Sequence, residues 1–123
     1  MLQRELAHAR ELREEVVEGR RRTLGAEHRE TLKAILNLAA VAFAQGDSAH
    51  ARELDEQVLP IYRRLLGEDH PYTLTAMDNL AAAMHSLGDL AGARKLQDDV
   101  LAAFRRVLAT FPLKIPHASP LFP

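Results

Sequence analysis

Two histidines stand at matching places where metal chemistry would first be sought. His28 follows Glu27, and His70 follows Asp69 at a position 42 residues further along the chain. A zinc site usually needs about four ligands that converge on one point. Two isolated pairs, each in its own loop, do not make such a set. We therefore predict that both histidines cap helices or pack within loops, and that the chain holds no metal.

The sequence lacks the motifs that support catalysis. It contains no glycine-rich phosphate loop, no nucleophile motif and no pair of carboxylates arranged for acid-base chemistry. It also has no cysteine, which removes disulfides, thiolate metal sites and a cysteine nucleophile. We predict a protein that is not an enzyme and needs no cofactor.

Charge and hydropathy give no support to nucleic acid or membrane partners. The 123 residues carry 16 basic and 17 acidic side chains, so no net charge draws the chain to polyanions. The sequence has no apolar run of about 18 residues and opens on a charged segment unlike a signal peptide. Together with the lack of cysteine, this predicts a cytoplasmic protein.

The dominant feature is a repeat with a period of 42 residues. The segment 66–74, LGEDHPYTL, matches 24–32, LGAEHRETL. In the same register, Asn37-Leu38-Ala39 matches Asn79-Leu80-Ala81, and Gly46-Asp47 matches Gly88-Asp89. Such a period indicates a repeat array. We divide the chain into the second helix of an incomplete repeat (1–23), repeat one (24–65), repeat two (66–108) and a proline-rich apolar tail (109–123).

Apolar periodicity and turn residues predict five helices, over 2–22, 29–45, 48–66, 71–87 and 90–109. Asp47 is expected to cap the third helix, and Pro71 suits the first position of the fourth. Pro60 is expected to bend the third helix. The residues expected to be buried in the first three helices are Leu2, Leu6, Ala9, Leu12, Val16 and Val17, then Leu32, Ile35, Leu38, Ala39 and Ala42, then Ala51, Leu54, Val58, Ile61, Leu65 and Leu66.

The Asn-Leu-Ala of each first helix, the Gly-Asp turn and the alanine soon after it resemble the tetratricopeptide repeat family. The 42-residue length and the loop Leu66-Gly67-Glu68-Asp69-His70-Pro71 are similar to its kinesin-light-chain-like subclass. The resemblance covers residues 2–108 and implies an all-α fold, a right-handed superhelical stack of antiparallel helix pairs. A two-helix period of this length alone would also fit HEAT or armadillo arrays.

In that family, the first helices of successive repeats line a concave groove that receives an extended peptide or a partner helix. By position, Asn37 and Asn79 match the family's groove asparagine, and an amide can pair with a peptide group of any sequence. The alternative is that both amides bridge helices within the stack. Helical spacing extends the predicted groove to Lys33, Leu36, Asn37, Ala40, Ala44, Thr75, Asp78, Asn79, Ala82 and Ser86.

Charged residues near this groove argue against one known mode of binding. A clamp for a peptide's terminal carboxylate needs basic residues beside the asparagines. Lys33 alone qualifies, whereas Leu36 and Asp78 stand where positive charge would help. The arginines at 20–22, 63–64 and 105–106 recur with the period and are expected to form a solvated rim near helix C-termini. Without interleaved aromatic residues, they do not indicate nucleic acid binding.

The two ends of the stack need cover, because a repeat buries only one side of its neighbour. The last helix carries Val100, Leu101, Phe104 and Leu108 with no successor. Further repeats of a longer protein, a second copy or the tail would each provide that cover. We predict that an apolar face of this chain or of a neighbour is covered by Phe111, Leu113, Ile115, Leu121 and Phe122.

The predicted function is protein-protein interaction, in which the groove binds a peptide or protein segment. The alternative is a self-associating structural or regulatory fragment of a larger signalling protein, which assembles through its open ends and apolar tail.

Overall fold

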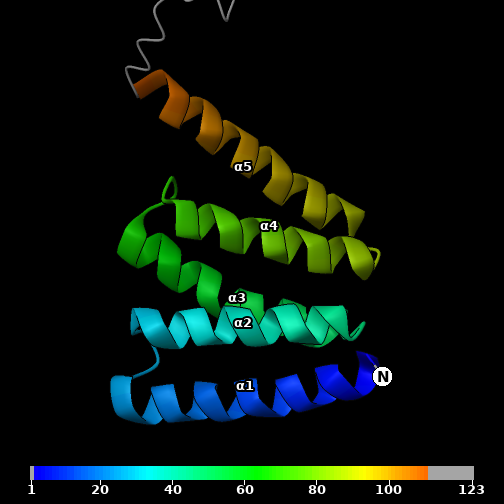
Figure 1. Ribbon diagram of the computed structural model, residues 1–123. Helices are drawn as coiled ribbons and strands as arrows, with labels where there is room; N and C mark the ends of the chain where they lie inside the picture. The colour runs from blue at the N-terminus through cyan, green and yellow to red at the C-terminus, as the bar shows by residue number, and fades with distance from the viewer. Residues whose placement is uncertain (1, 111–123) are drawn as a thin grey trace, which may run out of the picture.

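The computed structural model describes residues 2–110, which form five α-helices joined by short loops (Figure 1). They are α1 (Leu2–Leu24), α2 (Arg29–Ala44), α3 (Ser48–Leu66), α4 (Pro71–Ser86) and α5 (Leu90–Thr110). The described residues contain no strand, and each predicted helix ends within two residues of its observed limits. The all-α prediction is confirmed. None of these helices combines the length and hydropathy needed to cross a bilayer.

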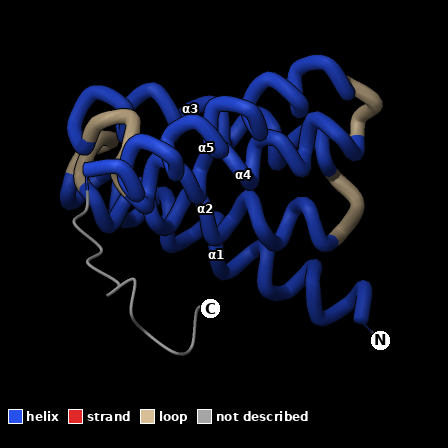
Figure 2. Tube along the Cα trace, turned by 90° about the horizontal axis from the view of Figure 1, so that it is seen from above, coloured by secondary structure: helices blue, strands red, loops and turns tan. Residues whose placement is uncertain are grey.

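The helices follow one another in a stack. Each packs against the helices before and after it in sequence, so α3 lies against both α2 and α4. Figures 1 and 2 show that the two longer loops, around His28 and His70, lie at one end of the molecule, and the two Gly-Asp turns lie at the other. Segments 42 residues apart therefore occupy equivalent places in the stack.

Both histidines cap helices, as predicted. The Nδ1 atom of His28 accepts a hydrogen bond from the backbone N–H of Glu30 at 3.1 Å. One repeat later, Nδ1 of His70 accepts from the backbone N–H of Tyr72 at 3.0 Å. Each imidazole thus satisfies a backbone donor that the first turn of a helix leaves without a partner.

The turns at the other end carry a second pair of caps. Oδ1 of Asp47 accepts from the backbone N–H of His50 at 3.2 Å, which confirms the predicted cap of α3. Oδ1 of Asp89 accepts from the backbone N–H of Gly92 at 3.0 Å. A Cβ at position 92 would lie 2.7 Å from Oδ2 of Asp89, so glycine leaves room for this carboxylate.

The core runs through the stack as a continuous layer between neighbouring helices. The burial predicted for α2 is confirmed, and that for α3 is confirmed at Ala51, Leu54 and Val58. Ile61 is half-buried, and at the end of α3 the prediction is wrong, because Leu65 and Leu66 are exposed. Small residues such as Ala42, Ala76 and Ala103 are fully buried and allow close approach of the helices. Further core residues are Leu74, Met77, Leu80, Ala93, Leu96 and Val100.

The burial predicted for α1 is largely wrong. Only Val17 of its apolar stripe is fully buried. The half-buried or exposed members are Leu2, Leu6, Ala9, Leu12 and Val16. The reason is that α1 packs mainly against α2, the one helix with which it shares extensive contact in the described part of the chain, so one side of its stripe is left without a packed neighbour.

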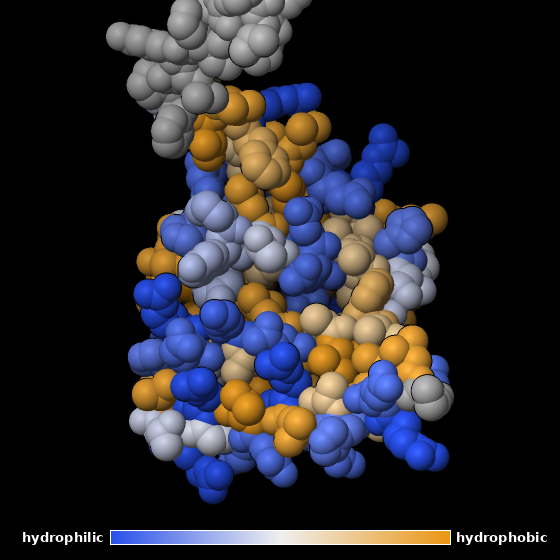
Figure 3. All heavy atoms as spheres, viewed as in Figure 1, coloured by the Kyte–Doolittle hydropathy of each residue, from blue (hydrophilic) through white to orange (hydrophobic). Residues whose placement is uncertain are grey.

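The outer face of α5 is exposed, whereas the equivalent face of α3 is covered by α4. Leu101 is 48% exposed, whereas Leu59, its equivalent in α3, is 3% exposed because α4 packs over it. Phe104 is exposed where its equivalent Tyr62 is buried. Figure 3 shows hydrophobic surface over the C-terminal half of α5. The tail residues predicted to cover an apolar face, 111, 113, 115, 121 and 122, lie outside the described residues.

Candidate functional site: a groove between α2 and α4

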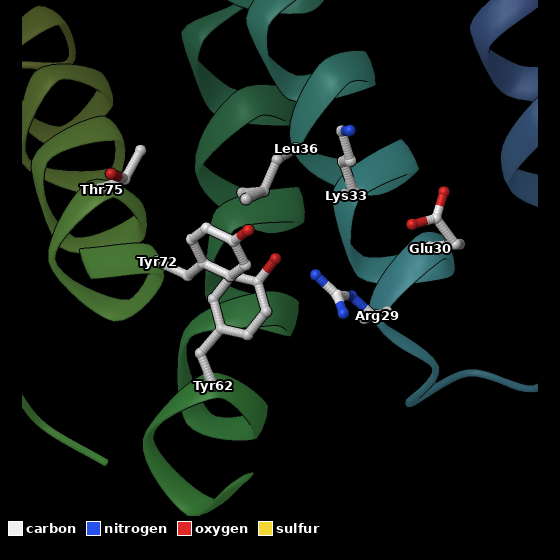
Figure 4. Close-up of a pocket in the computed structure, with 7 residues that line it drawn as sticks. All are labelled: Arg29, Glu30, Lys33, Leu36, Tyr62, Tyr72 and Thr75. Carbon is white, nitrogen blue, oxygen red and sulfur yellow. The ribbon is translucent and has the colours of Figure 1, made fainter. Parts of the chain in front are cut away.

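The predicted groove residues lie on one face of the molecule. All ten belong to α2 or α4, and each is exposed or half-buried. α3 packs against both helices and closes the space between them from behind (Figure 4). Six of the ten residues line two hollows along this space.

The first hollow, called here the tyrosine hollow, has a volume of about 270 Å³. It contains three predicted residues, Lys33 and Leu36 of α2 and Thr75 of α4. Its remaining lining residues were not predicted: Arg29, Glu30, Tyr62 and Tyr72. Because these residues come from three helices, spacing within one helix does not reveal them.

Two aromatic rings form one wall of the tyrosine hollow. Tyr62 of α3 and Tyr72 of α4 have ring centroids 6.0 Å apart and planes tilted by 42°. Figure 4 shows both hydroxyl groups between α2 and α4, with the Arg29 side chain extending toward them. Burial raises the pKa of the Tyr62 hydroxyl, the nearby Tyr72 raises it further, and the positive charge of Arg29 opposes both. At neutral pH the Tyr62 phenol can therefore donate a hydrogen bond.

The groove continues toward the loop end of the molecule. A neighbouring hollow of about 310 Å³ shares Arg29, Tyr62 and Tyr72 with the tyrosine hollow. Its other lining residues are Glu27 and His70 of the two loops, Leu32 of α2, and Leu65 and Leu66 at the end of α3. His70 supports the site directly, since its ring packs edge-on against Tyr72 with centroids 4.9 Å apart. The capping histidine thus also positions an aromatic wall of the groove.

The other hollow in the groove, called here the aspartate hollow, has a volume of about 170 Å³. Three predicted residues line it, Ala40 of α2 and Asn79 and Ala82 of α4. Ala39, Phe43 and Asp55 complete the lining. Figure 3 shows hydrophobic surface over the C-terminal half of α2, where Ala40 and Phe43 are exposed.

Asp55 of α3 lies at the base of the aspartate hollow. It is 2% exposed, and its Oδ1 atom has no hydrogen-bond partner among residues 2–110. Burial raises the pKa of this carboxyl to about 7, and the neighbouring charge of Glu56 adds to the rise. The sequence contained a signal, because an acidic residue stands within the apolar stripe of Ala51, Leu54 and Val58. We did not identify it from the sequence.

Four predicted residues line neither hollow: Asn37, Ala44, Asp78 and Ser86. The hydroxyl of Ser86 accepts a hydrogen bond from Ser48 of α3 at 2.7 Å, so it ties α4 to α3. Asn37 and Asn79 are equivalent in the repeat, but only Asn79 lines a hollow.

Comparisons with known proteins agree with this architecture. The tetratricopeptide repeat family model matches residues 1–64 and 34–106. Two solved structures come from Podosopora anserina, from a protein assigned as a kinesin light chain with nearly identical TPR-like repeats and from a variant of it. Each is 33% identical to this chain, with a TM-score of 0.80 over 85% of it. The chain spans about half of their length, 50% and 51%. No curated protein sequence matches the chain significantly.

Proposed function

Because this chain belongs to the tetratricopeptide repeat family, whose fold generally serves protein-protein interaction, we propose that it binds a peptide segment of a partner protein between α2 and α4. The observation that carries the proposal is the alignment of two hollows along one groove with a common back wall. Both hollows have a residue of α3 at their base, Tyr62 in the tyrosine hollow and Asp55 in the aspartate hollow.

The spacing of the hollows suits an extended peptide. Along α2, the tyrosine hollow is centred near Lys33 and the aspartate hollow near Ala40. Seven positions at ~1.5 Å each place the two about 10 Å apart. An extended chain covers that distance in about three residues at ~3.3 Å each. Two side chains of one bound peptide can therefore enter both hollows, and Asn79 can pair with a peptide group beside the second.

We propose binding as the sole activity of the groove. The chain performs no catalysis and needs no cofactor in this account, and a cytoplasmic location stays a prediction from the sequence. The groove offers hydrogen-bond donors at Arg29, Lys33 and the two phenols, apolar walls at Leu36 and Phe43, and a carboxyl at Asp55. Such a mixture of apolar walls with a few convergent polar groups is typical of binding sites.

A substitution that fills the groove tests the proposal. Peptides are selected from a random-peptide library on the full chain, and their affinities are then measured for Ala82→Arg and Ala7→Arg. Ala82 is exposed in the groove, whereas Ala7 is an exposed alanine of α1 outside it. We expect A82R to lose at least about tenfold in affinity, or ~1.4 kcal/mol, and A7R to bind as the unmodified chain does. Equal binding by A82R, or a library that yields no binder, contradicts the proposal.

A second candidate function is self-association through the outer face of α5. It is favoured by the exposure of Leu101, Phe104 and Leu108 at positions whose equivalents in α3 include the buried Leu59 and Tyr62. A second copy of the chain that presents the same face would cover these residues. Light scattering after size exclusion measures the mass of the full chain and of the double variant L101S/F104S. A dimer that the double variant abolishes supports this candidate, and a monomer in both cases refutes it.

A further inference from the structure

The aspartate hollow combines one buried acid with apolar walls. Asp55 is almost completely buried at its base. Within the described part of the chain, Oδ1 of this carboxyl lacks the hydrogen-bond partner that buried polar atoms normally have. The apolar residues that line the hollow are Ala39, Ala40, Phe43 and Ala82. A ligand that reaches Asp55 must therefore have an apolar stem and a hydrogen-bond donor at its tip.

We propose that the aspartate hollow binds the side chain of a lysine in the partner peptide, with the ammonium group held by Asp55 and by the side-chain oxygen of Asn79. This inference rests on the proposed function of the groove and names the chemistry of one anchor. The four-carbon stem of lysine suits apolar walls, and its ammonium group carries three donors and no acceptor.

Lysine fits this hollow better than arginine does. The planar guanidinium presents five donors in a fixed fork and is best matched by a carboxylate that accepts both arms. Here the acceptors are a carboxyl of α3 and an amide of α4, which converge from different helices. A compact point charge can meet both of them without a planar arrangement.

The charges around Asp55 leave its negative charge uncompensated. The other residues that line the hollow, from α2 and α4, are alanines, a phenylalanine and an asparagine, so none of them titrates. On α3, Glu56 is the charged neighbour that acts on Asp55, and it disfavours ionisation. Lys33 of α2 and Asp78 of α4 lie on the groove face but do not line this hollow. A cation brought by the ligand therefore supplies the missing charge.

Binding of the ammonium group requires an ionised Asp55. With the pKa of this carboxyl near 7, much of it is protonated at neutral pH in the free chain. The bound ammonium favours the charged form, so binding releases a proton and the affinity rises with pH until the carboxyl is fully ionised. We expect affinity at pH 6 to be about tenfold lower than at pH 8.

Nuclear magnetic resonance with a minimal probe tests this inference. The full ¹⁵N-labelled chain is titrated with N-acetyl-lysine methylamide and, as a control without the ammonium group, with N-acetyl-norleucine methylamide. We expect only the lysine probe to shift the backbone resonances of Ala39, Ala40, Asn79 and Ala82. We also expect its affinity to show the pH dependence above, and the carboxyl ¹³C titration of Asp55 to move to lower pH when the probe is bound.

Two substitutions distinguish binding of the ammonium group by Asp55 from general attraction to the negative charge of this face. Asp55→Asn removes the buried charge, whereas Asp78→Asn removes an exposed charge on the same face. We expect D55N to weaken the lysine probe at least about tenfold and D78N to change it less than about twofold. If D55N does not fold, the pH series and the norleucine control on the unmodified chain decide the question.

Equal binding of the lysine and norleucine probes, affinity unchanged by pH, or no shift in the aspartate hollow overturns the inference. Failure of the lysine anchor can be distinguished from failure of the proposed peptide groove. Peptides that A82R displaces but that bind without any lysine leave the groove as a binding site and reject the lysine anchor. A lysine probe that binds the hollow while no library peptide does keeps the anchor and rejects the peptide groove.

Discussion

Arg106 donates a hydrogen bond to the carboxylate of Asp69 at 2.7 Å, and 42 residues earlier Arg64 makes the same pair with Glu27. Each pair joins the end of a second helix to the loop that opens its own repeat. A second periodic pair joins Arg10 to Asp47 at 3.1 Å and Arg52 to Asp89 at 3.5 Å. Arg64 and Arg106 of the arginine rim expected from the sequence are therefore specific partners of the loop acids, whereas the turn acids pair with arginines outside the rim.

The first prediction concerns Arg106 and Asp69. The hydrogen bond from Arg106 holds the pKa of the Asp69 carboxyl below its usual value, so its contribution to stability is present above that value and lost as pH falls. In Arg106→Gln, we expect the Asp69 titration, followed by ¹³C resonance, to return toward the usual value. Arg105→Gln, at an exposed neighbour, should leave it unchanged. An Asp69 titration that R106Q does not move contradicts the pairing.

The second prediction concerns Asp55 and the pH dependence of stability. Its folded pKa lies above its ordinary value of 3.8, so its contribution to stability is full below pH 3.8 and is lost as pH rises to about 7. The loss is on the order of 4 kcal/mol at about 1.4 kcal/mol per pKa unit.

Urea unfolding of the unmodified chain and of D55N, followed from pH 4 to pH 8, measures this difference. We expect the stability of the unmodified chain to fall relative to that of D55N across this range. D78N serves as the control, because it removes an exposed carboxylate of α4 and should follow the unmodified chain. Parallel pH curves for D55N and the unmodified chain would show that Asp55 is not held protonated by burial.

The third prediction uses one substitution at two equivalent positions. Leu59 is buried between α3 and α4, and its counterpart Leu101 in α5 is about half exposed. Leu59→Ala should lower the free energy of unfolding by ~2–5 kcal/mol, since it leaves a cavity. Leu101→Ala should cost less than about 1 kcal/mol if its face meets only solvent. A large loss at both positions would indicate that something covers the outer face of α5.

The helices were predictable because their signals are local. Apolar spacing, the Gly-Asp turns and the capping residues act within a few positions, and the repeat shows each of them twice. The predictions of burial were wrong where packing depends on a neighbouring helix. The α1 stripe contains enough apolar residues for burial, but α1 packs against one helix rather than two.

The groove was only partly predictable for a similar reason. Asn79 follows from the resemblance to the tetratricopeptide family, and Lys33 and Ala82 follow from helical spacing once the first helices are assigned. Tyr62 and Asp55 reach the groove from α3, a second helix, whereas the resemblance to the family implied a groove lined by first helices. Their exposure to the groove depends on the separation of α2 and α4, which periodicity does not determine.

Resonance mapping of a library-selected peptide on the full ¹⁵N-labelled chain shows whether a partner binds between α2 and α4. We expect the largest shifts on the residues of α2 and α4 that line the two hollows, with Lys33, Leu36, Thr75, Asn79 and Ala82 among them. Shifts that cluster instead on the outer face of α5, around Leu101 and Phe104, would contradict this expectation and place the interaction surface at the end of the stack.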